Sequence, residues 1–137
     1  MGYTLVDHTA DIGIRVWADD VQGLFEEAAR ALFDIIIDRA TVTVRLERKV
    51  AVQGSGYEEL LVAWLSELLY LHEVEDLLFC DFSLTQLEQG MATGAARGER
   101  FHEGRHRIKT GVKAVTYHQL EIKEHEGRWH AQVIFDI

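Results

Sequence analysis

Three acidic groups near the two ends of the chain could together bind a metal ion. Asp11 lies just before an alternating apolar segment, while Asp136 is followed by Ile137 and its α-carboxylate. The apolar run Val133–Ile137 is unusual for a chain end, because termini are normally loose and polar. We therefore expect the last residue to lie in a strand. Its main-chain carboxylate would then lie beside the Asp136 side chain.

Hard divalent cations prefer oxygen ligands such as carboxylates, main-chain carbonyls and water. Asp11, Asp136 and Ile137 could supply three of these oxygens, and the sequence therefore suggests a cation site that joins the two ends. The alternative is that Asp11 caps a turn and that Asp136 belongs to a frayed end. His8 lies three residues before Asp11, where it could support the site or make a hydrogen bond that holds the loop.

A second possible metal motif is His102-Glu103-Gly104-Arg105-His106, which has the H-E-x-x-H pattern of zinc proteases. That chemistry requires a helix that places both imidazoles on one face. Gly104 interrupts the motif, and no helical apolar periodicity surrounds it. Segment 97–107 is also rich in arginine, whose charge would oppose a dication. We expect an exposed, basic, mobile loop or a contact surface here; a metal-dependent hydrolase using His102, Glu103 and His106 is kept as an alternative.

Hydrophobic periodicity predicts the elements that must position these residues. Two helices are expected, one opened by Asp19 and ending near Asp38, the other opened by a Ser55/Glu58 capping box and ending near Glu75. The expected β segments are 2–18, 41–53, 77–88, 91–99, 112–123 and 129–137. Glycines 94, 98 and 104 suggest a bulge or loop, and Glu126-Gly127 a hairpin turn.

These elements predict one α+β domain over residues 1–137. We expect a two-layer sandwich in which two long helices cover a mostly antiparallel sheet of six to seven strands. The formal net charge of −9 argues against nucleic-acid binding through a broad basic surface and suits a cation or a basic protein partner. Cys80 is the only cysteine, so no internal disulfide forms. With no membrane-spanning run and no signal peptide, we expect a cytoplasmic protein.

Four segments together resemble the archease family, in the same order and over the full chain. They are Asp7-His8-Thr9-Ala10-Asp11-Ile12-Gly13-Ile14, Leu60–Tyr70, Lys113–His118 and Ile134-Phe135-Asp136-Ile137. The segment with the H-E-x-x-H pattern falls where archeases have a variable stretch, which weighs further against a protease.

The resemblance implies a protein cofactor of an RtcB-type RNA ligase, which joins tRNA exons, rather than an enzyme. Such proteins promote the metal- and GTP-dependent guanylylation of the ligase and its multiple turnover, and they broaden its nucleotide use. The resemblance also implies a divalent cation, seen as calcium in the family, with manganese or magnesium as alternatives. Its ligands would be Asp11, Asp136 and Ile137. His8 and Lys113 are further candidates for partner contact or for support of the site, and a general chaperone or scaffold stays open as another function.

Overall fold

The structure is a computed structural model that describes residues 1–7, 11–88 and 90–137, with Asp7 described by its backbone alone. Two long helices and seven strands make up this part of the chain. In order they are β1 (Gly2–Asp7), β2 (Asp11–Ala18), α1 (Val21–Ile36), β3 (Leu46–Gln53), α2 (Tyr57–Glu75), β4 (Leu77–Glu88), β5 (Met91–Arg100), β6 (Ala114–His125) and β7 (Arg128–Asp136). A short 3₁₀ turn, Arg39–Thr41, follows α1. No helix of the described part is both long and apolar enough to span a membrane.

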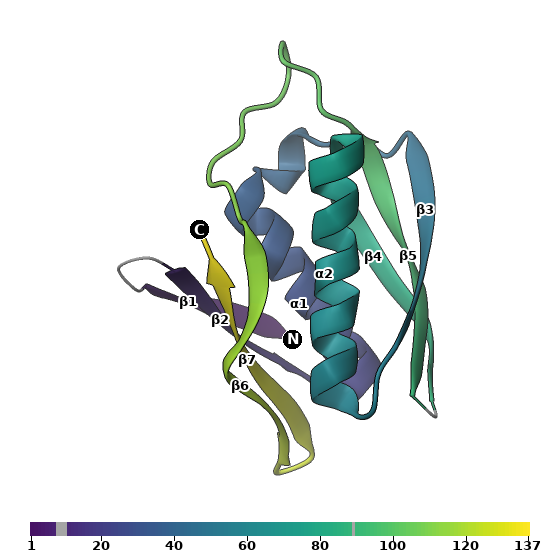
Figure 1. Ribbon diagram of the computed structural model, residues 1–137, viewed down its shortest axis with the longest axis vertical. Helices are drawn as coiled ribbons and strands as arrows, with labels where there is room; N and C mark the ends of the chain where they lie inside the picture. The colour runs from purple at the N-terminus through teal and green to yellow at the C-terminus, as the bar shows by residue number, and fades with distance from the viewer. Residues whose placement is uncertain (8–10, 89) are drawn as a thin grey trace.

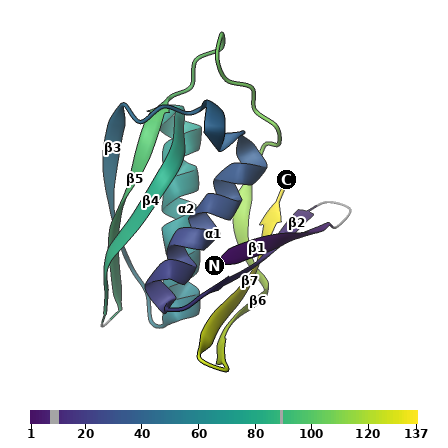
Figure 2. The ribbon, with the colours of Figure 1, turned by 180° about the vertical axis from the view of Figure 1, so that it is seen from behind.

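The strands form two separate antiparallel sheets with the two helices between them (Figures 1 and 2). One sheet has the order β1-β2-β7-β6, and the other has the order β3-β5-β4. Helix α1 packs on β2 and β4, and helix α2 packs on β6 and β3, so each helix contacts both sheets. This confirms the α+β class, the two long helices and the antiparallel pairing. The prediction of a single sheet is wrong, because the seven strands form two sheets.

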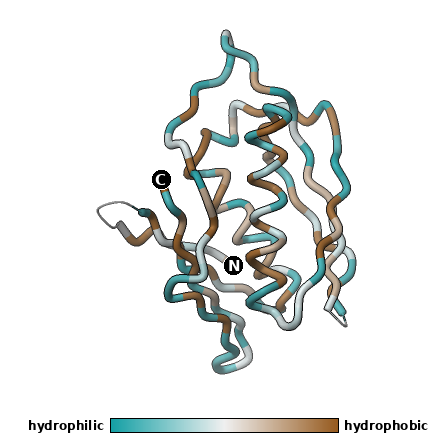
Figure 3. The backbone as a smooth tube through the Cα atoms, in the orientation of Figure 1, coloured by the Kyte–Doolittle hydropathy of each residue, from teal (hydrophilic) through white to brown (hydrophobic). Residues whose placement is uncertain are grey.

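The reason lies in how much of each helix surface is apolar. A helix that covers one sheet needs one apolar stripe, whereas a helix between two sheets must be apolar on two sides. Most positions of α1 are buried, including small residues that allow close approach from either side. These residues are Gly23, Leu24, Phe25, Glu27, Ala28, Ala29, Ala31, Leu32, Phe33, Ile35 and Ile36. In Figure 3 hydrophobic colour runs along both helices in the middle of the molecule.

One core joins the helices to both sheets. The ring of Phe33 packs against Phe79 and Phe82 of β4, with 5.5 Å between ring centroids in each pair. Trp64 of α2 is fully buried, and its indole N–H donates to the main-chain oxygen of Phe25 at 3.0 Å. Buried indoles usually find such a partner, so this bond fixes the two helices relative to each other.

Both helix starts differ from expectation. Asp20, not Asp19, caps α1, and its carboxylate accepts the Gly23 N–H at 2.6 Å. The predicted Ser55/Glu58 capping box does not form, because Gly56 precedes α2 with a φ of 126°. Only glycine adopts this backbone conformation readily. Ser55 lies outside the cap position and donates to the Glu59 carboxylate at 3.1 Å instead.

The predicted strand 41–53 begins later, at Leu46. Residues Arg39–Thr41 form the 3₁₀ turn, and Asp38 caps its N-terminus. The Thr43 N–H donates to the buried carboxylate of Glu99 rather than to a neighbouring strand. A backbone donor used by a side chain cannot take part in a strand ladder, so pairing starts only beyond this point.

Bulges occur in β4 opposite two glycines of β5, as the glycine pattern suggested. The register shifts between Phe79 and Asp81, and again between Leu84 and Gln86. A Cβ on Gly98 would lie 1.8 Å from the Leu78 oxygen, so the bulged strand approaches β5 where no side chain fits. Strand β5 is therefore continuous, and it forms the centre of its sheet.

The last two strands form the predicted hairpin. Its turn residues, Glu126 and Gly127, have φ values of 54° and 76°. Positive φ at both positions matches the turn type that suits the twist of paired strands. Strand β6 also carries an irregularity between Thr116 and Glu121.

Candidate functional site

The sheet register brings Asp11 and Asp136 together, although 125 positions separate them in the chain. The two residues are direct partners across β2 and β7. Partners in an antiparallel pair direct their side chains to the same face, with Cβ atoms about 5 Å apart. Asp11 is half-buried and Asp136 is exposed. Like charges directly opposite each other destabilise a sheet, and a bound cation would remove that cost.

Main-chain groups complete this edge of the sheet. Asp136 also pairs with Ala114 of β6, and its carbonyl accepts the Lys113 N–H at 2.8 Å. Ile137 follows immediately, and its half-buried side chain packs against the core. Continuing the register places Lys113, which is exposed, opposite Ile137. The structure thus gathers four of the five predicted site residues, while His8 lies outside the described residues.

The donor set at this edge fits a hard cation. Asp11 and Asp136 would contribute carboxylate oxygens, and Ile137 would contribute main-chain oxygen. Among the described residues, no three His, Cys, Asp or Glu side chains gather into a metal-binding group. A cation here would therefore depend on main-chain oxygen beside the two aspartates. Calcium, magnesium and manganese accept such oxygen ligands, whereas zinc prefers nitrogen and sulfur.

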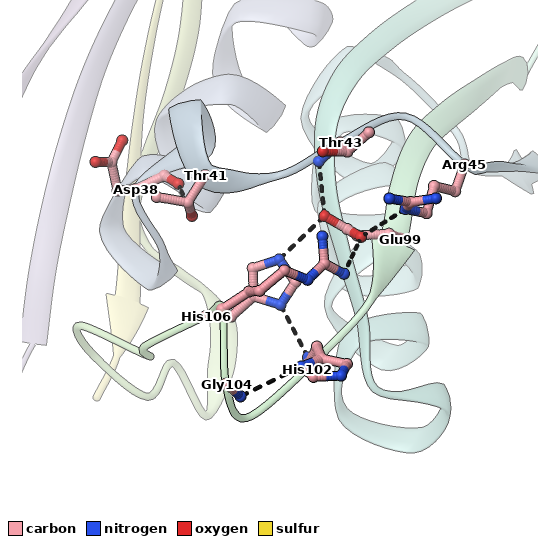
Figure 4. A network of polar contacts seen from close by, with 9 residues as sticks. Asp38, Thr41, Thr43, Arg45, Glu99, His102, Gly104 and His106 are labelled. Atoms are coloured by element: carbon pink, nitrogen blue, oxygen red, sulfur yellow. Dashed lines mark hydrogen bonds and ion pairs between the residues drawn. The ribbon is translucent and has the colours of Figure 1, made fainter.

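The H-E-x-x-H segment does not have the geometry of a zinc protease. Residues 101–113 contain no helix. The buried His106 ring uses both of its nitrogens (Figure 4): Nδ1 accepts the His102 N–H at 2.8 Å, and Nε2 lies 3.1 Å from the Glu99 carboxylate. Neither ring nitrogen is left to bind metal, and the alternative of a hydrolase using His102, Glu103 and His106 is therefore wrong.

Glu99 is the centre of a polar cluster that the sequence did not reveal (Figure 4). Its side chain is only 2% exposed. Besides His106, its carboxylate accepts the Thr43 N–H at 2.7 Å, Arg105 Nη2 at 2.6 Å and Arg45 Nε at 3.3 Å. Burial alone would raise the pKa of Glu99, but the Thr43, Arg105 and His106 donors outweigh it and lower the pKa to about 2.

The arginines of segment 97–107 are not all part of a mobile loop. Arg97 and Arg100 belong to strand β5. Arg97 pairs with Asp81 at 2.9 Å and with Glu47 at 3.0 Å, which ties the three strands of its sheet together. Arg100 donates to the Glu75 carbonyl at the end of α2, at 3.0 Å. Three of the four arginines, including Arg105, therefore have defined partners.

Comparison with known proteins decides the family. The model of the archease protein family matches residues 3–137, nearly the whole chain. The chain belongs to the archease family.

Curated archeases resemble the chain over nearly its full length. The protein archease of Methanopyrus kandleri is 41% identical over 140 residues, and the alignment covers 100% of both chains. The protein archease of Pyrococcus furiosus is 43% identical over 136 residues, with 96% of this chain and 95% of the relative covered.

Solved structures of archease-like proteins have the same fold. The solution structure of Methanobacterium thermoautotrophicum protein 1598 matches with a TM-score of 0.88, 37% identity and 99% coverage of both chains. An archease from Thermotoga maritima, described as a possible chaperone, matches with a TM-score of 0.68 and 20% identity over 96% of this chain and 94% of its own. At that identity the second match supports the fold alone.

Proposed function

We propose that this archease-family protein activates an RtcB-type RNA ligase and catalyses no reaction itself. It would promote the metal- and GTP-dependent guanylylation of the ligase and its multiple turnover, and it would broaden the nucleotides that the ligase accepts. The observation that carries the proposal is the direct pairing of Asp11 with Asp136 beside Ile137. The archease resemblance implies these residues as cation ligands, and the opposition of Asp11 and Asp136 in the sheet register supports that assignment.

Asp11, Asp136 and Ile137 would hold the cation where the start of β2 meets the end of β7. Asp136 is exposed, so a partner could approach from that side. When bound, a divalent cation supplies positive charge that offsets negative charge developing on a phosphate during transfer. The protein's net charge of −9 would favour docking on a basic surface around the ligase active site. Lys113, exposed beside this edge, is the nearest candidate for a direct ligase contact.

The direct test is a guanylylation assay with the cognate ligase, with and without this protein. We expect the native protein to increase both the rate of guanylylation and the number of ligation turnovers. Asp11→Ala should lose this stimulation. Asp19→Ala is the matched control, because Asp19 is an exposed aspartate at the other end of β2 and lies outside the site. Full stimulation by a folded Asp11→Ala protein would remove the cation site from the mechanism.

A second test concerns the main-chain carboxylate. A short glycine-serine extension after Ile137 replaces that carboxylate by a peptide carbonyl and moves the charge away. We expect calcium affinity to fall, while the thermal midpoint measured without calcium stays close to the native value. Equal calcium binding by the extended protein would show that the terminal carboxylate is no ligand.

A general chaperone is the second candidate; an archease of the same fold, from Thermotoga maritima, is described as a possible chaperone. This function would need no cation and would serve many clients. Co-purification at native expression level separates the two. A single dominant RNA ligase supports the activator, and a diffuse set of proteins that persists in chelator supports the chaperone.

A further inference from the structure

We propose that a pocket between the start of β3 and the end of β5 binds the phosphate of a nucleoside phosphate. The pocket has a volume of about 460 Å³, within the range of small-molecule sites. It is lined by Arg45, Leu46, Glu99, Arg100, Phe101, His102 and Arg105. Arg45 lies just before β3, and the other lining residues belong to the three-stranded sheet or to the loop after it, whereas Asp11 and Asp136 belong to the other sheet. The inference therefore does not rest on the proposed activator function.

The pocket lining carries an excess of positive charge. The lining contains three guanidinium groups, from Arg45, Arg100 and Arg105, and one carboxylate, from Glu99. Two positive charges are therefore in excess here, in a chain whose formal net charge is −9. Glu75 does not cancel this excess, because its carboxylate pairs with Arg48 at 3.2 Å and only its carbonyl meets Arg100.

Two of the arginines are held in place by the buried carboxylate of Glu99. Glu99 holds Arg105 Nη2 at 2.6 Å and Arg45 Nε at 3.3 Å on the same oxygen, Oε1. Its other oxygen is occupied by the Thr43 N–H and by His106. A buried carboxylate with four donors is a rigid anchor, so the two guanidinium groups are held side by side before any ligand arrives (Figure 4 labels Arg45 and Glu99).

Each anchored arginine keeps donors for a ligand. A guanidinium group has five N–H donors, and the bonds to Glu99 use one from each arginine. The side chains of Arg45 and Arg105 are 63% and 42% exposed, so the remaining donors are accessible from solvent. Paired N–H groups of this kind bind phosphate oxygens in a bidentate manner.

An aromatic wall completes the pocket. Phe101 is 37% exposed and therefore presents apolar ring surface. The centroid of its ring lies 6.0 Å from that of the buried His106 ring, and this contact restricts the position of the Phe101 ring. Leu46 contributes further apolar surface to the lining. A flat base can stack on such a ring while its phosphate contacts the arginines, which points to a nucleotide rather than to a bare anion.

The test is a titration of the ¹⁵N-labelled full chain by NMR with adenosine monophosphate, guanosine monophosphate, adenosine and inorganic phosphate. We expect the monophosphates to shift the Arg Nε–H signals and the amide of Phe101, with a weaker response to phosphate and to adenosine. A short 5′-phosphorylated oligoribonucleotide is added as a separate arm. Tighter binding of the oligonucleotide than of the monophosphates would identify an RNA end as the natural source of the phosphate.

Arg100→Ala is the decisive variant, because the hydrogen bonds to the Glu99 carboxylate come from Thr43, Arg45, Arg105 and His106, whereas Arg100 donates to the Glu75 carbonyl. We expect about a tenfold weaker affinity for the monophosphates, since a hydrogen bond to a charged group is lost. Arg128→Ala, at an exposed position of β7 in the other sheet, is the control and should bind normally. Saturable shifts that are the same in all three proteins, or no shifts at millimolar nucleotide, would overturn the proposal. Equal affinity for phosphate and for the monophosphates would overturn its nucleotide part.

Discussion

At the scale of single residues, the negative charge of two carboxylate arrangements is balanced in different ways. Asp11 and Asp136 lie opposite each other at the start of β2 and the end of β7, where a cation would offset their repulsion. Glu99 is buried, and protein donors already satisfy its charge. The first arrangement suits reversible binding, whereas the second suits permanent structure. The histidine-rich segment near Glu99 is therefore no metal site, because both His106 nitrogens already have protein partners.

Asp136→Asn should abolish cation-dependent stabilisation. Calcium that binds only the folded state raises the free energy of unfolding by an amount that grows with the logarithm of its concentration. We expect the thermal midpoint of the native protein to rise with calcium and that of Asp136→Asn to stay constant. Calorimetric titration with calcium measures the same loss directly. Asp38→Asn, which changes the cap of the 3₁₀ turn and lies in neither β2 nor β7, is the control and should keep the calcium response.

Glu99→Gln should lower stability at neutral pH and change its dependence on pH. The folded pKa of Glu99 is about 2, below its ordinary value of 4.5. Its stabilisation is therefore fully present above pH 4.5 and is lost as the pH falls through 2. We expect the variant to lose about 2 kcal/mol at pH 7 and to have a flatter stability profile below pH 4.5.

Urea unfolding over a pH series measures both effects of Glu99→Gln. Glu103→Gln, at an exposed position of the same loop, is the matched control and should stay within about 0.5 kcal/mol of the native protein. An unchanged acid profile in Glu99→Gln would contradict the role given to the buried carboxylate.

At the scale of elements, the pairing of β5 with β4 requires glycine at two positions of β5. Gly94 and Gly98 lie opposite the two bulges of β4, where the neighbouring backbone comes too close for a Cβ. The register shift between Phe79 and Asp81 lies between two aromatic residues of β4, Phe79 and Phe82, that both pack against Phe33 of α1. Glycine in a central strand normally weakens it, so the close approach accounts for its presence here.

Gly98→Ala should destabilise the protein by about 2 kcal/mol, because the added Cβ would lie 1.8 Å from the Leu78 oxygen and the sheet would have to move. Chemical denaturation measures this change. Gly111→Ala is the matched control, since no atom lies within 4 Å of its added Cβ. We expect Gly111→Ala to leave stability unchanged or slightly raised. A neutral Gly98→Ala would mean that the two strands separate easily.

At the scale of the whole molecule, the helices form the middle layer and each sheet covers one side of them (Figures 1 and 2). Buried apolar residues of both sheets and both helices belong to one continuous core. The candidate cation edge lies on one sheet and the arginine pocket on the other. Both sheets therefore pack on the same pair of helices.

Phe33→Ala should destabilise both sheets together. The Phe33 ring is fully buried and packs against Phe79, Phe82 and His72. We expect a loss of about 4 kcal/mol and a single cooperative transition by far- and near-ultraviolet circular dichroism. Tyr70→Ala, at a position of α2 that is 54% exposed, is the control and should change stability little. Two separate transitions in Phe33→Ala would show that the sheets unfold independently.

The sequence alone predicted what depends on neighbouring residues. Periodicity placed α2 and most strands, because side-chain direction repeats every few residues in a helix or strand. Glu126 and Gly127 identified the last hairpin, and the glycines of β5 indicated a bulge, because such backbones allow few residue types. The family resemblance came from short segments and was confirmed over nearly the whole chain.

Tertiary structure decided what depends on distant residues. One apolar stripe did not show that α1 has a sheet on both sides. Thr43, Glu99 and His106 meet only because β5 ends beside the start of β3. Because the Thr43 N–H bonds to Glu99, strand β3 begins only at Leu46. Because both His106 ring nitrogens have protein partners, His106 cannot bind a metal. Asp11 and Asp136 were named as a pair from the sequence, but only the register of β2 with β7 places them opposite each other. Such contacts follow from which strands pair, and no local pattern specifies that choice.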